Sequence, residues 1–198
     1  MRRLAVVGLV VAALLASACG DKDEPLGPTA TVPQGTTTTN PYAVPAVIDE
    51  AYVNRVLAGL DQAVGDLTRL IATSQALPPE VLERLRSIYI DEDQFQFEIQ
   101  LFQSSLGRGF EGIRPDPGNR VTTVTELIHV AVECVFAKVD MDTSAVATTP
   151  NPAFRTRWIA IAPLPDERIA LGNVTGWGLI YEGFGPDGTA PSDPCAER

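Results

Sequence analysis

The stretch PDPGNRVTTVTELIHVAVECVFAKVDM, residues 115–141, decides the fold. It opens with a Pro/Gly turn cluster, and β-branched and aromatic residues dominate the rest of it. The pattern predicts strands over 121–130 and 134–141, and the same composition returns at 154–162 and 177–184. Four strands in succession, without a long helical pattern between them, indicate an antiparallel sheet.

Upstream of this stretch, the spacing of the apolar residues is typical of amphipathic helices. Apolar residues recur at helical spacing over 48–73, and Asp49 is the expected N-cap. Two prolines, Pro78 and Pro79, separate this segment from a short second helix, and Asp91 opens a third. The sequence therefore predicts the α+β class: three N-terminal helices and a four-stranded antiparallel sheet in a single domain, residues 46–198.

The first 18 residues have the order of a secretory signal peptide. Arg2 and Arg3 precede an apolar run over 4–15, which is too short to span a bilayer, and small residues come after it. These small residues stand before Cys19 as in a lipobox, although Ala16 occupies the position where that motif prefers Leu. We expect acylation of Cys19 (palmitate is a typical chain) and a lipid-anchored location on the extracytoplasmic face of the cell membrane. Cleavage by the ordinary signal peptidase, giving a secreted protein, is the alternative.

Residues 19–45 are rich in Pro, Thr and Gly. Such a composition cannot bury enough apolar surface to offset the entropy of ordering, so we expect a disordered linker between the lipidated cysteine and the domain.

The chain has three cysteines, an odd number for an oxidising compartment. If Cys19 carries lipid, Cys134 and Cys195 are left to pair. The bridge would close a loop of about 60 residues and contribute roughly 4 kcal/mol in the chain-entropy model. Two unpaired thiols are the alternative.

The charge and the motifs exclude several classes of function. A formal net charge of −10 repels phosphate backbones, so we expect no nucleic-acid partner, and membrane contact only through the lipid on Cys19.

The G-x-G-x-x-G match at 107–112 comes after a predicted helix and not after a strand, so we interpret it as a connection between elements. The single histidine, His129, fits a half-buried sheet residue better than a general base. We expect no catalytic residue, no metal site and no cofactor, and enzymatic activity stays uncertain.

Four side chains are candidates for lining an apolar pocket: His129, Trp158, Trp177 and Tyr181. The alternative for the aromatic residues is that they form the core between sheet and helices.

The order of these segments resembles a known family. Residues 119–128, 135–140 and 157–160 match the strand order of SnoaL-like domains of the nuclear transport factor two superfamily, and residues 52–57 and 65–69 resemble exported proteins of high-GC Gram-positive bacteria. The resemblance implies a curved, cone-like sheet, an interior where the enzymes of the family use a histidine and acids, and homodimerisation through the sheet. Only His129 could match that histidine.

The function expected from these observations is a membrane-tethered extracytoplasmic lipoprotein module without catalysis, which binds a protein partner at the cell surface. The alternative is a carrier of small apolar ligands, or a weak SnoaL-like enzyme, that uses the cone interior.

Overall fold

The computed structural model describes residues 40–184 and 189–196. The expected signal peptide, Cys19 and most of the expected linker therefore lie outside the described residues. Within the described ranges, no helix is both long enough and apolar enough to cross a membrane.

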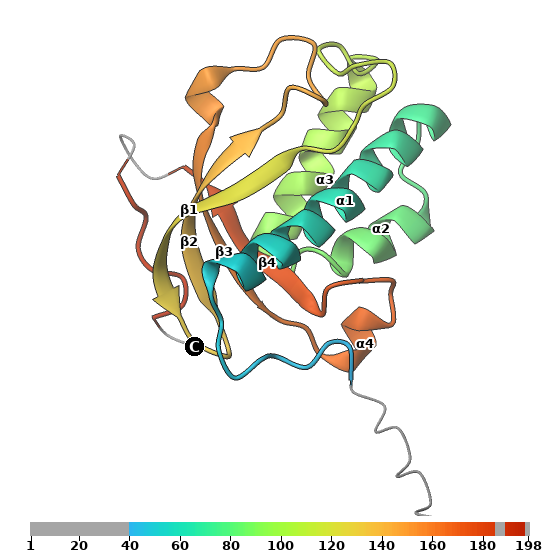
Figure 1. Ribbon diagram of the computed structural model, residues 1–198. Coiled ribbons are helices and arrows are strands. Elements are labelled where there is room, and N and C mark those ends of the chain that lie inside the picture. Colours follow the sequence, from blue (N-terminus) through green and yellow to red (C-terminus); the bar gives the residue numbers. More distant parts are fainter. Residues whose placement is uncertain (1–39, 185–188, 197–198) are drawn as a thin grey trace, which may run out of the picture. The chain divides into compact units, whose positions relative to one another are not determined.

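The described residues form helices and strands in a fixed order along the chain (Figure 1). The elements are α1 (Glu50–Ser74), α2 (Pro79–Arg86), α3 (Glu92–Gly107), β1 (Val121–Val130), β2 (Val135–Asp142), a 3₁₀ turn (Pro152–Phe154), β3 (Thr156–Pro163), α4 (Asp166–Ile169) and β4 (Trp177–Gly183). The strands form one sheet in the order β1-β2-β3-β4, and every neighbouring pair is antiparallel. The α+β class and the antiparallel four-stranded sheet are confirmed. The described part also contains the short helix α4, which the sequence pattern did not indicate.

The helices begin where their capping residues require. Asp49 is the N-cap of α1, and its side chain accepts a hydrogen bond from the backbone N–H of Tyr52. Asp91 does the same for α3, while Pro79 occupies the first turn of α2, where no N–H is needed. These starts agree with the sequence pattern because capping depends on a few adjacent residues.

Both edges of the sheet are covered in part. On β1, the backbone N–H groups of Thr122 and Val124 donate to the side chains of Asp61 and Asn54 on α1, at 2.7 and 2.8 Å. On β4, Leu179 exchanges backbone hydrogen bonds with the segment 88–90. At these positions the backbone groups of the edge strands are paired and cannot bond to another chain.

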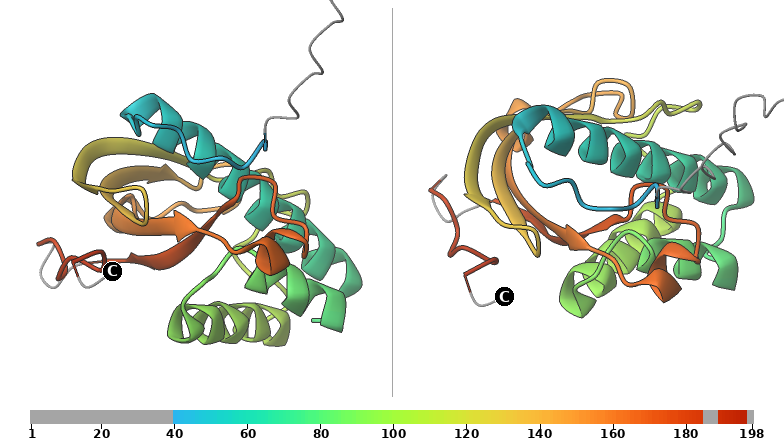
Figure 2. Two further views of the ribbon diagram at one scale, coloured as in Figure 1. Left: turned by 90° about the horizontal axis from the view of Figure 1, so that it is seen from below. Right: turned by 60° about the horizontal axis from the view of Figure 1, so that its bottom comes forward.

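The main core lies between the helices and one face of the sheet, where α1 contributes Leu60, Leu67 and Ile71. A second, smaller cluster lies on the other face, where Phe136 and Trp158 pack with the cysteines. In both views of Figure 2 the C-terminal residues 189–196 run on this side, away from α1 and α3.

The C-terminal segment is attached to the sheet by a disulfide. Cys134 and Cys195 are bonded, with their Cα atoms 5.6 Å apart, which confirms the predicted pairing. A second attachment is polar: His129 Nδ1 lies 2.8 Å from Asp193 Oδ2. Both contacts involve the β1–β2 hairpin, so this hairpin anchors the end of the chain.

The folded domain begins before the expected boundary at residue 46. Residues 40–45 lie against the domain: Val44 packs on the main core, and Tyr42 lies close to Gly176. A side chain at Gly176 would collide with Tyr42, and the φ of 74° there also favours glycine. The last residues of the expected linker are therefore part of the fold.

Candidate functional site: a cavity between α1, α3 and the sheet

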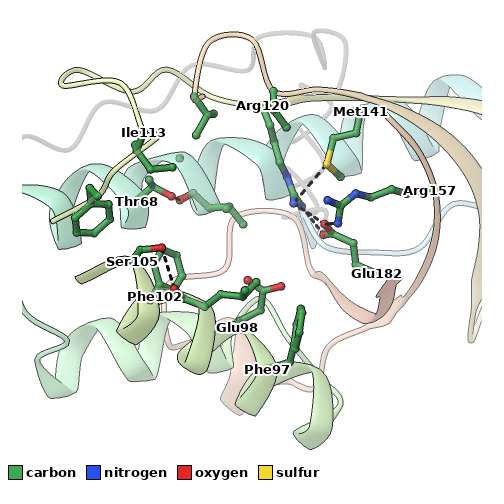
Figure 3. A pocket seen from close by; sticks show the side chains of 16 residues that line it. Thr68, Phe97, Glu98, Phe102, Ser105, Ile113, Arg120, Met141, Arg157 and Glu182 are labelled. Atoms are coloured by element: carbon green, nitrogen blue, oxygen red, sulfur yellow. Dashed lines mark hydrogen bonds and ion pairs between the residues drawn. The ribbon is translucent and has the colours of Figure 1, made fainter. Parts of the chain in front are cut away.

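A cavity of about 300 Å³ lies between α1, α3 and the inner face of the sheet (Figure 3). Most of its wall is apolar. The apolar wall residues are Val64, Phe97, Leu101, Phe102, Phe110, Ile113, Met141 and Val146. Its polar wall is concentrated on Glu98, Arg120, Arg157 and Glu182, which come from α3, the turn before β1, β3 and β4. The cavity therefore has an apolar body and one charged end.

Arg120 is the centre of the charged end. Its Nε donates to Asp61 at 2.7 Å, and its two terminal nitrogens donate to the two oxygens of Glu182, each at 2.8 Å. A second cation, Arg157, donates to Glu182 at 3.1 Å. The side chains of Asp61, Glu182 and Arg120 are only 5%, 3% and 12% exposed, so this is a buried ionic network. Burial raises the pKa of Asp61, an effect that Arg120 opposes.

A β-bulge makes this arrangement possible. Ala160 pairs with Tyr181 but Ile161 pairs with Leu179, so Ile180 is an extra residue in β4. Leu179 belongs to the main core, whereas Ile180 and Tyr181 both pack in the cluster on the outer face. The alternation of side chains then resumes one residue late, which turns Glu182 inward to meet Arg120. Without the extra residue, Glu182 would point to the outer face.

Glu98 lies beside this network without joining it. It points from α3 into the cavity, toward the end where Arg120 and Glu182 meet (Figure 3). Its carboxylate accepts a hydrogen bond from Gln94 at 3.2 Å. Burial, together with the negative charge of Glu182, raises the pKa of Glu98 to about 7, although Arg120 acts in the opposite direction. Near neutral pH this carboxyl group is therefore present in both protonation states.

The wall of the cavity includes exposed apolar side chains and one strained residue. Phe97 and Leu101 on α3 are 52% and 46% exposed. Phe110, from the Gly-rich turn after α3, has a φ of 58°. A bulky residue in this left-handed region costs of the order of 1–3 kcal/mol, and such strain clusters at functional sites. Here the strained turn sets an aromatic ring into the wall of the cavity.

The four residues predicted to line a pocket are separated by the structure, and none of them lines this cavity. His129 pairs with Asp193 at the C-terminal segment, a carboxylate distant in sequence. Trp158 and Tyr181 pack in the outer-face cluster. Trp177 is fully buried in the main core, where its Nε1 donates to the hydroxyl of Tyr52 at 2.7 Å. Trp177 thus agrees with the alternative interpretation, a core residue between sheet and helices, whereas Trp158 packs on the opposite face of the sheet.

Sequence reasoning missed the charged residues of the cavity. Glu98 falls between Phe95, Ile99 and Phe102, on the apolar side of a predicted helix, which is a signal that could have been noticed. Glu182 could not have been found from periodicity, since the bulge reverses its side. The inward position of Arg120 depends on the packing of α1 against β1.

Neither a metal-binding cluster in the described residues nor a similarity to a known protein indicates a further site. Across residues 40–184 and 189–196, no group of three or more His, Cys, Asp and Glu side chains is placed to hold a metal ion. No family model, no curated protein and no solved structure matches the chain.

The raised pKa of Glu98 has a consequence for stability. The folded-state pKa of about 7 lies above the ordinary value of 4.5. Between these pH values the folded protein keeps a proton that the unfolded chain has lost. The free energy of unfolding should therefore fall as the pH rises through this window, by at most about 1.4 kcal/mol per pH unit.

The variant Glu98→Gln is expected to lose this part of the pH dependence, since Gln does not titrate. Urea denaturation of both proteins at several pH values from about 4 to about 8, which brackets this window, measures it. Asp93→Asn, at an exposed position of the same helix, is the control and should keep the slope of the parent. Parallel pH profiles for the parent and Glu98→Gln would contradict the burial of this carboxyl group.

Proposed function

We propose that this domain is a binding module that holds a small, largely apolar molecule with one polar end in the cavity between α1, α3 and the sheet. In the same proposal the module is a lipoprotein, attached to the extracytoplasmic face of the membrane through Cys19, and its sheet has the cone-like form of SnoaL-like domains. The observation that carries the binding function is the cavity itself, which has apolar walls and a single charged end.

The size and composition of the cavity support this function. Ligand sites are concave, mostly apolar and equipped with a few polar groups that orient the ligand, and their volumes start near roughly 300 Å³. The cavity of about 300 Å³ is at the lower end of that range, which favours a ligand with few heavy atoms. Its charged end is already fixed by ion pairs, so binding requires little rearrangement there.

The expected protein partner at the cell surface remains a prediction. Part of the outer sheet face is buried in the cluster that contains Cys195. In contrast, Ile128, Val130 and Val132 near the end of the β1–β2 hairpin are 42%, 45% and 51% exposed. If a partner or a second copy of the chain binds the sheet, this hairpin offers the apolar surface for it.

Two adjacent serines of α3 provide a matched test of the ligand site. Ser105 lines the cavity, whereas Ser104 is exposed and does not. We expect 1-octanol to raise the melting temperature of the parent and of Ser104→Trp, but not of Ser105→Trp, where the indole fills the cavity. At a hundredfold excess over Kd the stabilisation should be about 2.7 kcal/mol, or several degrees.

Differential scanning fluorimetry with increasing octanol measures these shifts, and calorimetric titration checks the stoichiometry. An equal shift in Ser105→Trp would place the ligand elsewhere. If eight-carbon probes of every head group leave the parent unchanged, the proposed function is wrong.

A further inference from the structure

The charges around the cavity do not balance. Two acids, Asp61 and Glu182, are matched by two cations, Arg120 and Arg157, through the ion pairs described above. Glu98 is a third acid, and it forms no ion pair with any residue in the described ranges; its hydrogen-bond donor is the neutral amide of Gln94. When Glu98 is ionised, the charged end of the cavity therefore carries one negative charge in excess.

The two arginines are poorly placed to receive an anion. Arg120 uses Nε and both terminal nitrogens on Asp61 and Glu182. Arg157 uses Nε on the carbonyl oxygen of Phe154 and one terminal nitrogen on Glu182. An anionic head group would have to compete with these carboxylates and would also meet the charge of Glu98.

A cation would find favourable contacts at the same place. Phe97 and Phe102 line the cavity one residue before and four residues after Glu98 on α3. Aromatic faces attract ammonium groups, most strongly where water is displaced. A protonated amine next to Glu98 would thus gain an ion pair and aromatic contacts, while its hydrocarbon part would lie against the apolar wall.

We propose that the ligand is a primary amine with a hydrocarbon body, whose ammonium group pairs with the Glu98 carboxylate in the cavity. This inference rests on the proposed function, since it names the chemical class of the molecule that the cavity holds. Glu98 acts as a binding residue that selects the head group, and Arg120 keeps Glu182 neutralised so that the extra charge stays with Glu98.

The titration of Glu98 adds a pH signature. The charged and titratable groups around it are Arg120 before β1, Arg157 on β3, Glu182 on β4, Tyr89 after α2 and Asp61 on α1. The amine requires the ionised form of Glu98, whose pKa is about 7. An alkylamine stays protonated up to a pH of about 10. Amine affinity should therefore rise about tenfold between pH 6 and pH 8, with release of a proton on binding.

The test compares octylamine, 1-octanol and octanoate, which share one tail, on the parent and on Glu98→Gln. We expect octylamine to bind the parent at least tenfold more tightly than octanol at pH 8, with the advantage shrinking at pH 6. In Glu98→Gln the affinities for octylamine and octanol should become similar. Asp93→Asn, which changes an exposed acid of the same helix, should keep the preference for the amine.

The outcomes separate this inference from the proposed function. If octanol binds and Ser105→Trp blocks it, but octylamine has no advantage or octanoate binds as tightly, the amine inference is wrong while the ligand site stands. A preference for octylamine that survives in Glu98→Gln also overturns the inference. If none of the three probes binds the parent, the proposed function is wrong, and the amine inference that rests on it is wrong as well.

Discussion

Replacing Arg120 by Met is expected to lower the free energy of unfolding by about 3–5 kcal/mol. The reason is the pair of carboxylates it would leave behind. Asp61 and Glu182 are 5% and 3% exposed at their side chains, so water cannot solvate them when the guanidinium is gone. Arg157 compensates Glu182 in part, but Asp61 would lose its only ion pair in the described part of the chain. Urea denaturation at neutral pH measures the loss.

A matched control for this prediction is Arg155→Met. Arg155 also forms a bidentate pair, with Asp140, but the two side chains are 60% and 36% exposed. Exposed pairs contribute about 0–1 kcal/mol, so this variant should unfold close to the parent. Equal losses in the two variants would show that Arg120 does not balance buried charge.

If Arg120→Met does not fold, a triple variant keeps the prediction testable. Combining Arg120→Met with Asp61→Asn and Glu182→Gln removes one cation and both anions of the network, and leaves Arg157, whose side chain is 22% exposed, as the remaining cation. The amide introduced in place of the Asp61 carboxylate would still offer an oxygen to the backbone N–H of Thr122, which now donates to Asp61 at 2.7 Å. The triple variant should recover much of the lost stability, because the cost comes from unpaired charge rather than from missing contacts. A triple variant less stable than the single one would contradict this explanation.

The sequence pattern predicted those parts of the fold that depend on neighbouring residues. Asp49 and Asp91 cap helices because a short polar side chain reaches an N–H three residues ahead. The strand β1 begins at Val121 and ends at Val130, as its β-branched composition indicates. The disulfide was predicted by counting the cysteines, since few pairings are available to three of them.

The candidate site could not be predicted in the same way because it depends on contacts between distant segments. Asp61 and Glu182, which Arg120 joins, lie 59 and 62 residues from it in the sequence. The direction of Glu182 depends on one extra residue in β4, and strict alternation gives the opposite side. Two of the predicted pocket residues, Trp158 and Tyr181, are likewise placed on the outer face by the pleat and the bulge.

Removing the Cys134–Cys195 bridge is the second change with a large expected effect. The bridge joins residues 61 positions apart, and a loop of that length corresponds to about 4 kcal/mol in the chain-entropy model. The double variant Cys134→Ala/Cys195→Ala should therefore unfold at a much lower urea concentration than the parent. Since the bridge restricts the unfolded chain, the loss should appear even though the core between the helices and the sheet is untouched.

Reduction of the parent provides the control for this variant. A thiol reductant should lower the unfolding midpoint of the parent to near that of the double variant, and should leave the double variant unchanged. His129→Ala removes the polar contact between the hairpin and the C-terminal segment, a pair whose side chains are 32% and 29% exposed. Its effect should stay within about 1 kcal/mol. If His129→Ala costs as much as the loss of the bridge, the segment is held by local packing. If His129→Ala has only the small expected effect, the covalent link stabilises the domain through the unfolded state. In that case the double variant should bind octanol with unchanged affinity, because the cavity lies on the opposite face of the sheet.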